Sequence, residues 1–198
     1  VPATIAVADG AIRVGLSSEE LERLATVAGV MKLSRADLAC ALVKGATGST
    51  TVAATMICAQ LAGIEVFATG GIGGVHRGAE ATFDISADLQ ELAQTPVAVV
   101  SAGAKGLLDI PKTLEVLETN GVPVIGYGTD RFPAFWSRDS GLPAALRADT
   151  PDEVAATIAM QRRLGLKGGV LIANPVPEAD EIPADEMETH IATALTDA

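Results

Sequence analysis

Aromatic residues are scarce in this chain of 198 residues, where Phe, Trp and Tyr together make up 3%. Hydrophobic residues nevertheless reach 48%, so the core has to be built from Ala, Val, Leu and Ile. Such small aliphatic side chains suit helices that pack closely on a parallel sheet. The composition therefore argues against a β-sandwich rich in Tyr and Trp, and the length suits one compact α/β domain or a fragment of one.

Basic residues are also few, with 14 Lys and Arg against 25 Asp and Glu and a net charge of −11. They are scattered singly, so the chain lacks the positive patch that polymeric nucleic acid or an anionic membrane requires. No apolar run reaches transmembrane length, and no charged region precedes a short apolar segment. The sequence thus predicts a soluble, unexported protein with no nucleic-acid polymer and no membrane as a partner.

Cysteine occurs only twice, as Cys40 and Cys58, both in alanine-rich helical stretches. Buried thiols are the expected interpretation there, ahead of ligands or nucleophiles, and the count indicates a reducing cytoplasm. The chain also lacks an initiator methionine and runs from Val1 straight into VPATIAVADG. We expect the amino end to be an interior boundary, with part of the natural protein missing.

Strand and helix patterns alternate along the chain. Asp9-Gly10 predicts a hairpin turn, and SSEELERLATVAG predicts a helix with Ser17 or Ser18 as its N-cap and Gly29 as its stop. The segment 130–151 contains three prolines and an aromatic cluster, which is typical of a long surface loop. Helices are further predicted over 34–45, 50–62, 86–94, 111–121 and 151–164 with an acidic helix at the end, and buried strands over 64–68, 97–103, 122–128 and 168–177.

This alternation predicts a single α/β domain over residues 1–198, with a mostly parallel sheet covered by helices on both faces. Ligands bind such sheets at the carboxyl ends of the strands. The stretch ATGGIGGVHRGAEATFDISADL, residues 68–89, follows one predicted strand. It fails as a dinucleotide fingerprint because His76 stands where the third glycine belongs, and no Lys follows to make a P-loop. Its glycines allow either a backbone nest that cradles a small phosphate or only a tight turn.

Three oxygen-bearing residues, Asp84, Ser86 and Asp88, alternate along FDISADL. Ser86 followed by Asp88 is ordinary chemistry for a helix N-terminus. The same stretch also offers the hard oxygen ligands that Mg²⁺ or Mn²⁺ prefers, often with water in most of the coordination shell. The pattern leaves both interpretations open.

Lys105 is the most informative residue, because it is one of five lysines and follows a buried strand in VAVVSAGAKGLLD. An amine that is partly desolvated, or placed near another cation, has a depressed pKa and attacks carbonyl carbon. A solvated loop lysine is the alternative. The position at a strand's carboxyl end favours examining Lys105 as a nucleophile.

Long motifs carry a family resemblance that covers essentially the whole chain. It resembles the pseudouridine-5′-phosphate glycosidase family, which includes proteins associated with indigoidine biosynthesis and implies an indigoidine synthase A-like α/β/α fold. The motifs are VPATIAVADG, KGATGSTTVAAT, FATGGIGGVHRGAEATFDISADLQELA, SAGAKGLLDIPKTLEVLETNGVPVIGY and GGVLIANPVPE.

The resemblance implies reversible cleavage of the C–C glycosidic bond of pseudouridine 5′-phosphate to uracil and ribose 5-phosphate, by a manganese-dependent homotrimer. The enzyme is then a C-glycosidase, and a hydro-lyase when the reaction is written in the synthetic direction. A carbon leaving group cannot be expelled by protonating a heteroatom, so the sugar has to be opened and its C1′ held by an amine in a Schiff-base adduct. Lys105 matches the family's covalent lysine.

Other roles follow from the same resemblance. Asp84 corresponds to the Mn²⁺ ligand, and Asp88 is the implied proton shuttle. His76 is implied as an acid or an orienting group, against the alternative of a loop histidine satisfied by its turn. Lys32 and Thr69 to Gly71 would bind the phosphate of the substrate. The full set of implied substrate-binding residues is Lys32, Val52, Thr69, Gly70, Gly71, Ser86, Ala87 and Asp88.

One departure from the family matters. Family members carry, upstream of the VPATIAV motif, a segment with the glutamate that acts as general acid in opening the ring, and beyond the present motifs a C-terminal region with further substrate contacts. We therefore expect residues 1–198 to be a fragment that lacks both segments. Alternatives are another phosphosugar enzyme with a Schiff-base lysine, an indigoidine-pathway protein, or a catalytically incomplete copy that binds ligand. The acidic end, residues 177–198, is interpreted as a solvated helix face, which could pack against the absent region, ahead of a metal or partner site.

Overall fold

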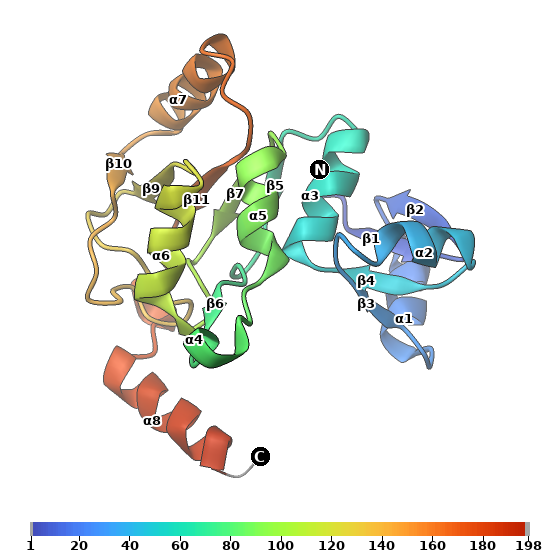
Figure 1. Ribbon diagram of the computed structural model, residues 1–198, viewed down its shortest axis with the longest axis horizontal. Helices are drawn as coiled ribbons and strands as arrows, with labels where there is room; N and C mark the ends of the chain where they lie inside the picture. Colours follow the sequence, from blue (N-terminus) through green and yellow to red (C-terminus); the bar gives the residue numbers. More distant parts are fainter. Residues whose placement is uncertain (1, 197–198) are drawn as a thin grey trace. The chain divides into compact units, whose positions relative to one another are not determined.

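The computed structural model describes residues 2–196, and the chain forms two compact units, Val1–Glu65 and Val66–Ala198 (Figure 1). Each unit contains its own sheet. The prediction of a single domain over residues 1–198 stays a prediction, because two such units can belong to one domain or to two. Within the described residues, no helix combines the length and the apolar character needed to cross a membrane.

The first unit is built on a mixed sheet with the strand order β2-β1-β4-β3. β1 pairs with β2 and β4 in antiparallel fashion, whereas β3 and β4 are parallel. The predicted hairpin is confirmed: Asp9 and Gly10 both have positive φ, 50° and 74°, as a two-residue hairpin turn needs. The elements are β1 (Ile5–Ala8), β2 (Ala11–Val14), α1 (Ser18–Thr26), β3 (Met31–Leu33), α2 (Leu38–Val43), β4 (Gly48–Thr50) and α3 (Val52–Leu61).

The helices of the first unit follow their capping residues. Ser17 caps α1 in a reciprocal capping box with Glu20, as predicted. The predicted helix over 34–45 is shorter, because the Asp37 carboxylate accepts a hydrogen bond from the Ser34 N–H (2.8 Å) in a turn that delays the helix to Leu38.

The two cysteines differ in burial. Cys58 lies on α3, where seven of the ten residues are buried, and burial raises the pKa of its thiol. Cys40 is exposed, so the prediction of a buried thiol was wrong there. The reason is that α2 buries only Leu38 and Ala41, and Cys40 falls outside that face.

The second unit contains a fully parallel five-stranded sheet with the order β10-β9-β11-β7-β5, which confirms the predicted fold class. β6 and β8 form a separate antiparallel pair. The elements are β5 (Val66–Ala68), β6 (Val75–His76), α4 (Ala79–Thr82), α5 (Ala87–Gln94), β7 (Ala98–Ser101), β8 (Leu108–Asp109), α6 (Ile110–Thr119), β9 (Val124–Tyr127), β10 (Leu146–Ala148), α7 (Pro151–Arg163), β11 (Val170–Ala173), the 3₁₀ turn η1 (Glu178–Asp180) and α8 (Ala184–Thr196).

Helices flank the parallel sheet. Val154 and Ile158 of α7 pack against a buried cluster formed by residues of β7, β9, β10 and β11. Alternate strand residues such as Val99 and Leu171 are fully buried and point to the opposite face, since successive side chains of a strand alternate. Figure 1 shows α5 and α6 in front of that face. The core is therefore aliphatic, as the shortage of aromatics predicts.

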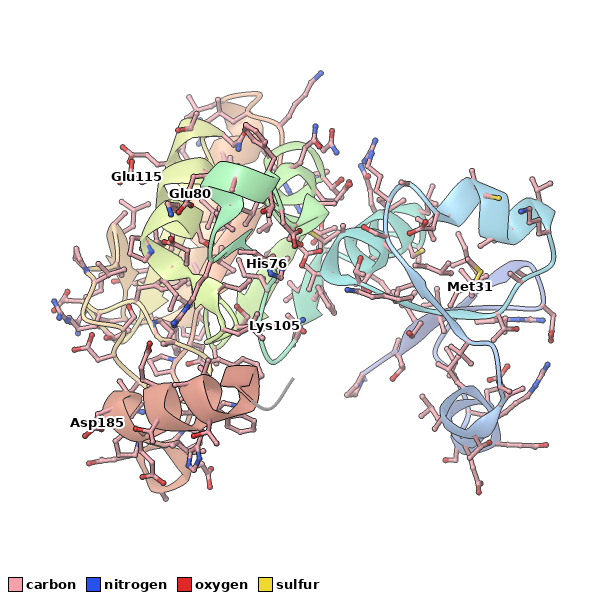
Figure 2. The ribbon with its side chains drawn as sticks, turned by 60° about the horizontal axis from the view of Figure 1, so that its bottom comes forward. Met31, His76, Glu80, Lys105, Glu115 and Asp185 are labelled. Atoms are coloured by element: carbon pink, nitrogen blue, oxygen red, sulfur yellow. The ribbon has the colours of Figure 1, made fainter. Side chains whose placement is uncertain are left out.

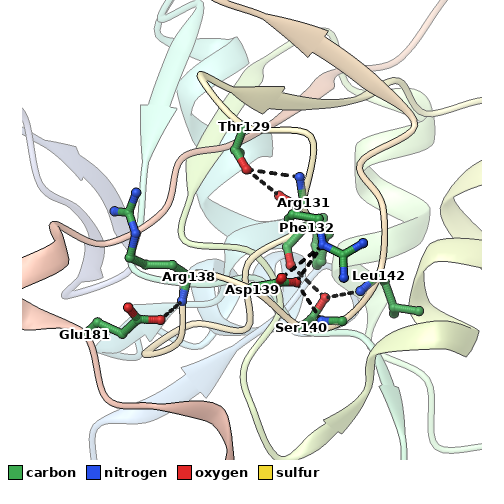
Figure 3. Close-up of polar contacts among 9 residues, drawn as sticks. Thr129, Arg131, Phe132, Arg138, Asp139, Ser140, Leu142 and Glu181 are labelled. Carbon is green, nitrogen blue, oxygen red and sulfur yellow. Dashed lines mark hydrogen bonds and ion pairs between the residues drawn. The ribbon is translucent and has the colours of Figure 1, made fainter.

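The segment 130–145 is a long loop, held by its own polar contacts (Figure 3). Arg131 pairs with Asp139, and Ser140 Oγ donates to the Phe132 carbonyl at 2.6 Å. Phe132 is fully buried and anchors the loop, whereas Trp136 of the same aromatic cluster is 46% exposed. The short strand β10 at the end of this loop was not predicted, because Leu-Arg-Ala has neither β-branched residues nor alternation.

Candidate functional site

The glycine-rich turn continues the parallel sheet beyond the carboxyl ends of β5 and β7. The Thr69 N–H donates to the Val100 carbonyl (3.0 Å), and the Ile72 N–H donates to Gly103 O (3.0 Å). A third hydrogen bond between the two segments comes from the Lys105 N–H, which donates to Ile72 O (3.2 Å). The predicted phosphate segment and the loop that carries the lysine therefore lie side by side at the sheet edge where such folds bind ligands.

The Asp88 carboxylate accepts a backbone hydrogen bond from this glycine turn, residues 69–76. Its Oδ2 accepts a hydrogen bond from the Gly73 N–H at 2.8 Å, and its side chain is buried, with 5% of the residue exposed. Ser86 is the N-cap of α5 and accepts from the Asp88 N–H (3.3 Å), so the capping interpretation is confirmed. A methyl group on Gly73 would lie 2.3 Å from Ser86 Oγ, so only glycine fits at this approach.

Most amides of the turn already have partners inside the protein. Thr113 Oγ1 accepts from the Val75 N–H at 2.9 Å, and the hydroxyl itself donates to Asp109 O. A phosphate nest would therefore have to use the other amides of the turn, those of Gly70, Gly71 and Gly74. The turn amides with an acceptor in the chain belong to Thr69, Ile72, Gly73, Val75 and His76.

His76 and Asp84 form the polar rim of the site. Their main chains join where the His76 N–H donates to Asp84 O (3.0 Å), and His76 Nδ1 lies 3.7 Å from Asp84 Oδ2. The Asp84 side chain is 63% exposed, so a cation there could keep most of its water shell. Among residues 2–196, no group of three or more His, Cys, Asp or Glu side chains is arranged to hold a metal. The residues present therefore fit the predicted Mn²⁺ site only with Asp84 as a single carboxylate ligand and water in the rest of the coordination shell.

Lys105 is exposed, as the alternative of a solvated loop lysine expects and not as a partly desolvated residue, and its side chain is accessible to a ligand (Figure 2). Its carbonyl accepts from the Leu108 N–H (3.0 Å), and Leu108 pairs with His76 across β6 and β8. The chain thus connects the lysine to the His76–Asp84 rim through one strand pair.

Two predicted site residues belong to the first unit. Lys32 is exposed on β3, and Val52 begins α3, where it is buried. Their predicted contacts with substrate stay predictions, as do the roles assigned to the residues of the second unit.

Sequence reasoning missed three contributors to this site. Phe135, with φ of 61°, places its ring beside Gly70 and Gly71 and edge-on to Trp136. Arg77 donates to Glu188 of α8 at 3.0 Å. The aromatic run FPAFW was a usable signal for Phe135. No sequence signal links Arg77 to Glu188, because 111 residues separate them.

Comparison with known proteins agrees with this architecture. The family model for indigoidine synthase A like protein matches residues 1–198. The chain belongs to that family. Pseudouridine-5′-phosphate glycosidases from Methylobacterium nodulans and from a Jannaschia species are 68% and 66% identical to it over 198 residues, its full length. The crystal structure of the prealnumycin C-glycosynthase AlnA in complex with ribulose 5-phosphate is 44% identical, with a TM-score of 0.93 over 100% of this chain and 65% of that one.

These relatives are longer than this chain. It spans 59% of the Methylobacterium protein and 66% of the Jannaschia protein. This chain, with its parallel sheet, glycine turn and lysine loop, therefore corresponds to only part of each of those relatives.

Proposed function

We propose that this chain is the lysine-bearing part of a pseudouridine-5′-phosphate glycosidase, which cleaves the C–C glycosidic bond of its substrate reversibly. The observation that carries the proposal is the 68% identity over all 198 residues to a relative of that name. The geometry supports it, because Lys105 stands against the glycine turn at the carboxyl edge of the sheet. Over the whole reaction one water is consumed: the bond from C1′ to C5 of uracil is replaced by C5–H, and the sugar leaves as ribose 5-phosphate.

Lys105 is the proposed nucleophile. Its amine would bond to C1′ as the C1′–O4′ bond of the sugar breaks and O4′ leaves as a hydroxyl. Cleavage of the C1′–C5 bond, with a proton delivered to C5, would then release uracil and leave a Schiff base between Lys105 and C1′, which one water hydrolyses to ribose 5-phosphate. The exposed side chain lies three residues before β8 and beside the glycine turn, where it can reach a ligand that lies over that turn.

The remaining roles are assigned by position. Gly70, Gly71 and Thr69, with Lys32, would bind the phosphate, and Ser86 to Asp88, with Val52, would contact the sugar and uracil. His76 would orient the reacting groups. Asp84 would hold Mn²⁺, which when bound supplies positive charge and ordered water to the site. Asp88 would move a proton.

The proposed assembly is a homotrimer in the cytoplasm, with a small phosphorylated nucleoside as substrate. The acidic composition, with a net charge of −11, supports a partner smaller than polymeric nucleic acid. Gel filtration with light scattering tests the trimer directly.

The deciding experiment measures uracil release from pseudouridine 5′-phosphate with Mn²⁺ by a protein of the relatives' length that contains these residues. We expect release by the parent and none by the Lys105→Ala variant, with an unchanged circular dichroism spectrum. Lys167→Ala, at an exposed loop position far along the chain, is the matched control and should retain the parent rate. Release at the parent rate by Lys105→Ala would remove the covalent role.

A second candidate is a related C-glycoside enzyme that joins or cleaves a pentose phosphate with another carbon partner. The likeness to prealnumycin C-glycosynthase favours it. Borohydride trapping with ribose 5-phosphate would label Lys105 under both proposals. Only the requirement for uracil in the synthetic direction distinguishes them.

A further inference from the structure

The acidic helix α8 lies against the loop that carries Lys105. Met187 and Ile191 are its half-buried residues, and both approach Gly106, the residue after the lysine. A methyl group on Gly106 would lie 3.5 Å from Ile191 Cδ1 and 3.9 Å from Met187 Cγ. Figure 2 shows this helix, which carries the labelled Asp185, along the side of the unit where Lys105 lies. It is thus packed on the protein rather than only solvated.

Arg77 joins the helix to the loop by charge. Its Nη1 donates to Glu188 Oε1 at 3.0 Å, and its Nη2 reaches the Gly106 carbonyl at 3.5 Å. One guanidinium therefore contacts both α8 and the lysine loop, and Arg77 itself directly follows β6 in the chain. The pair keeps the pKa of Glu188 below its ordinary value and that of Arg77 above it.

The segment that leads into α8 is anchored on the other side of the lysine loop. The Phe135 N–H donates to Ala102 O (2.8 Å), which attaches the 130–145 loop to the strand end before Lys105. The Ile182 N–H donates to Trp136 O (2.9 Å), and Ser137 Oγ donates to Ile182 O (2.7 Å). The lysine loop, residues 102–107, therefore contacts the glycine turn, the aromatic loop and α8, while Lys105 and Leu107 stay exposed.

We propose that α8 is a clamp on the Lys105 loop and that Arg77, through Glu188 and the Gly106 carbonyl, is a positioning residue for the lysine. The inference rests on the proposed function for Lys105 as the reacting amine. The helix holds the loop closed, and the amine is then presented at one angle to the opened sugar. Because both ends of the ion pair are about half exposed, at 45% and 63% of their side chains, the pair shifts the closed population by at most about fivefold.

The first measurement follows the loop without chemistry. Hydrogen exchange of a peptide covering 102–109, detected by mass spectrometry, should be about three- to fivefold faster in Arg77→Met and in Glu188→Gln than in the parent. The reciprocal pair Arg77→Glu with Glu188→Arg should return exchange toward the parent rate. Arg147→Met is the matched control, because Arg147 forms a similarly exposed ion pair with Asp130 and Asp149, neither of which lies within residues 102–109. It should leave the peptide unchanged.

The second measurement follows the amine. With ribose 5-phosphate as the probe, borohydride reduces the Schiff base to a stable secondary amine on Lys105, which peptide mapping locates. The trapping rate at saturating probe should fall about three- to fivefold in Arg77→Met, with an unchanged half-saturating concentration, because positioning and not phosphate binding is lost. The charge-reversed pair should recover most of the rate.

The outcomes separate the two proposals. No labelled Lys105 in the parent would contradict the proposed function, and the exchange data would still decide whether α8 clamps the loop. Exchange and trapping at parent rates in Arg77→Met would overturn the clamp. Slower trapping that the charge-reversed pair does not recover would assign Arg77 a role other than pairing with Glu188, and would also overturn it.

Discussion

The lysine loop is supported from two sides by polar contacts of opposite character. On the side of the glycine turn, Asp88 and Thr113 accept from backbone N–H groups while they are 5% and 0% exposed. On the side of α8, Arg77 and Glu188 pair with 45% and 63% of their side chains exposed. The two sides differ in how far these polar contacts are exposed to water.

This difference in burial sets what each contact can do. A buried N–H that loses its acceptor has no water to replace it, so the glycine turn has one stable geometry. An exposed ion pair competes with water at every moment, so α8 can open at a small cost in free energy. We infer that the turn fixes where a ligand lies, whereas α8 sets how often the lysine is presented to it.

A side chain added at Gly73, where the glycine turn packs closely against the start of α5, should have the largest effect on stability. In Gly73→Ala the new methyl group would meet Ser86 Oγ at 2.3 Å and Ser86 Cβ at 2.7 Å, so the N-terminus of α5 would have to move. We expect the free energy of unfolding to fall by about 3 kcal/mol. Urea denaturation monitored by circular dichroism measures it.

The same substitution on the α8 side is the control. A methyl group on Gly106 meets its nearest neighbour, Ile191 Cδ1, at 3.5 Å, which is ordinary packing. Gly106→Ala should therefore change stability by less than about 1 kcal/mol. Equal destabilisation by the two variants would contradict the contrast between a rigid turn and an adaptable clamp.

Removing the buried carboxylate should come next. Asp88→Ala leaves the Gly73 N–H without its acceptor, and we expect a loss of about 2 kcal/mol in unfolding free energy. Asp88→Asn keeps an oxygen for that N–H and should cost less. If Asp88 also moves a proton, the Asn variant will lose uracil release far beyond its loss of stability. Parallel losses of both would leave Asp88 as a support for the turn alone.

The sequence predicted the parts of this arrangement that are local. The hairpin at Asp9-Gly10, the cap at Ser86 and the buried strands depend on neighbouring residues, whose spacing and turn chemistry are visible in the chain. Lys105 and the 69–71 segment were also placed correctly at one sheet edge, because parallel strands share their carboxyl ends.

The contacts that the sequence did not reveal are distant along the chain or lack a pattern. Asp88 lies in the first turn of α5, as expected, but its hydrogen bond with an amide 15 residues earlier has no signal in the sequence. Glu188 belongs to an acidic stretch that reads as a solvated face, since like charges without interspersed bases give no hint of a partner. β10 is three residues of ordinary loop composition that become a strand by pairing with β9.

Thr113→Val tests the second buried acceptor with a smaller expected effect. Valine keeps the shape of threonine but cannot accept from the Val75 N–H, so we expect a loss of about 1.5 kcal/mol in unfolding free energy. Thr157→Val on α7 removes a similar hydroxyl bond, to the Glu153 carbonyl four residues earlier, at an exposed position. That control should stay within about 0.5 kcal/mol of the parent, because water replaces the lost bond.

The smallest effect is expected when a lower pH protonates Glu188 and removes its ion pair with Arg77. The pairing with Arg77 lowers the pKa of Glu188 from its ordinary value of 4.5, so the folded state favours the carboxylate. The stabilisation is therefore complete above about pH 4.5 and is lost as the pH falls through the depressed pKa. Fluorescence of Trp136, the single tryptophan, which accepts from the Ile182 N–H at the entry to α8, measures the change.

Glu188→Gln removes the titrating group, so the Trp136 signal should stay flat between pH 5 and the onset of acid unfolding. Asp109 contributes to that unfolding in both proteins, because Lys112 lowers the pKa of Asp109 as well. A transition that is the same in the parent and in Glu188→Gln would mean that the ion pair does not hold α8, and the distinction between a fixed turn and an opening clamp would then depend on packing at Gly106 alone.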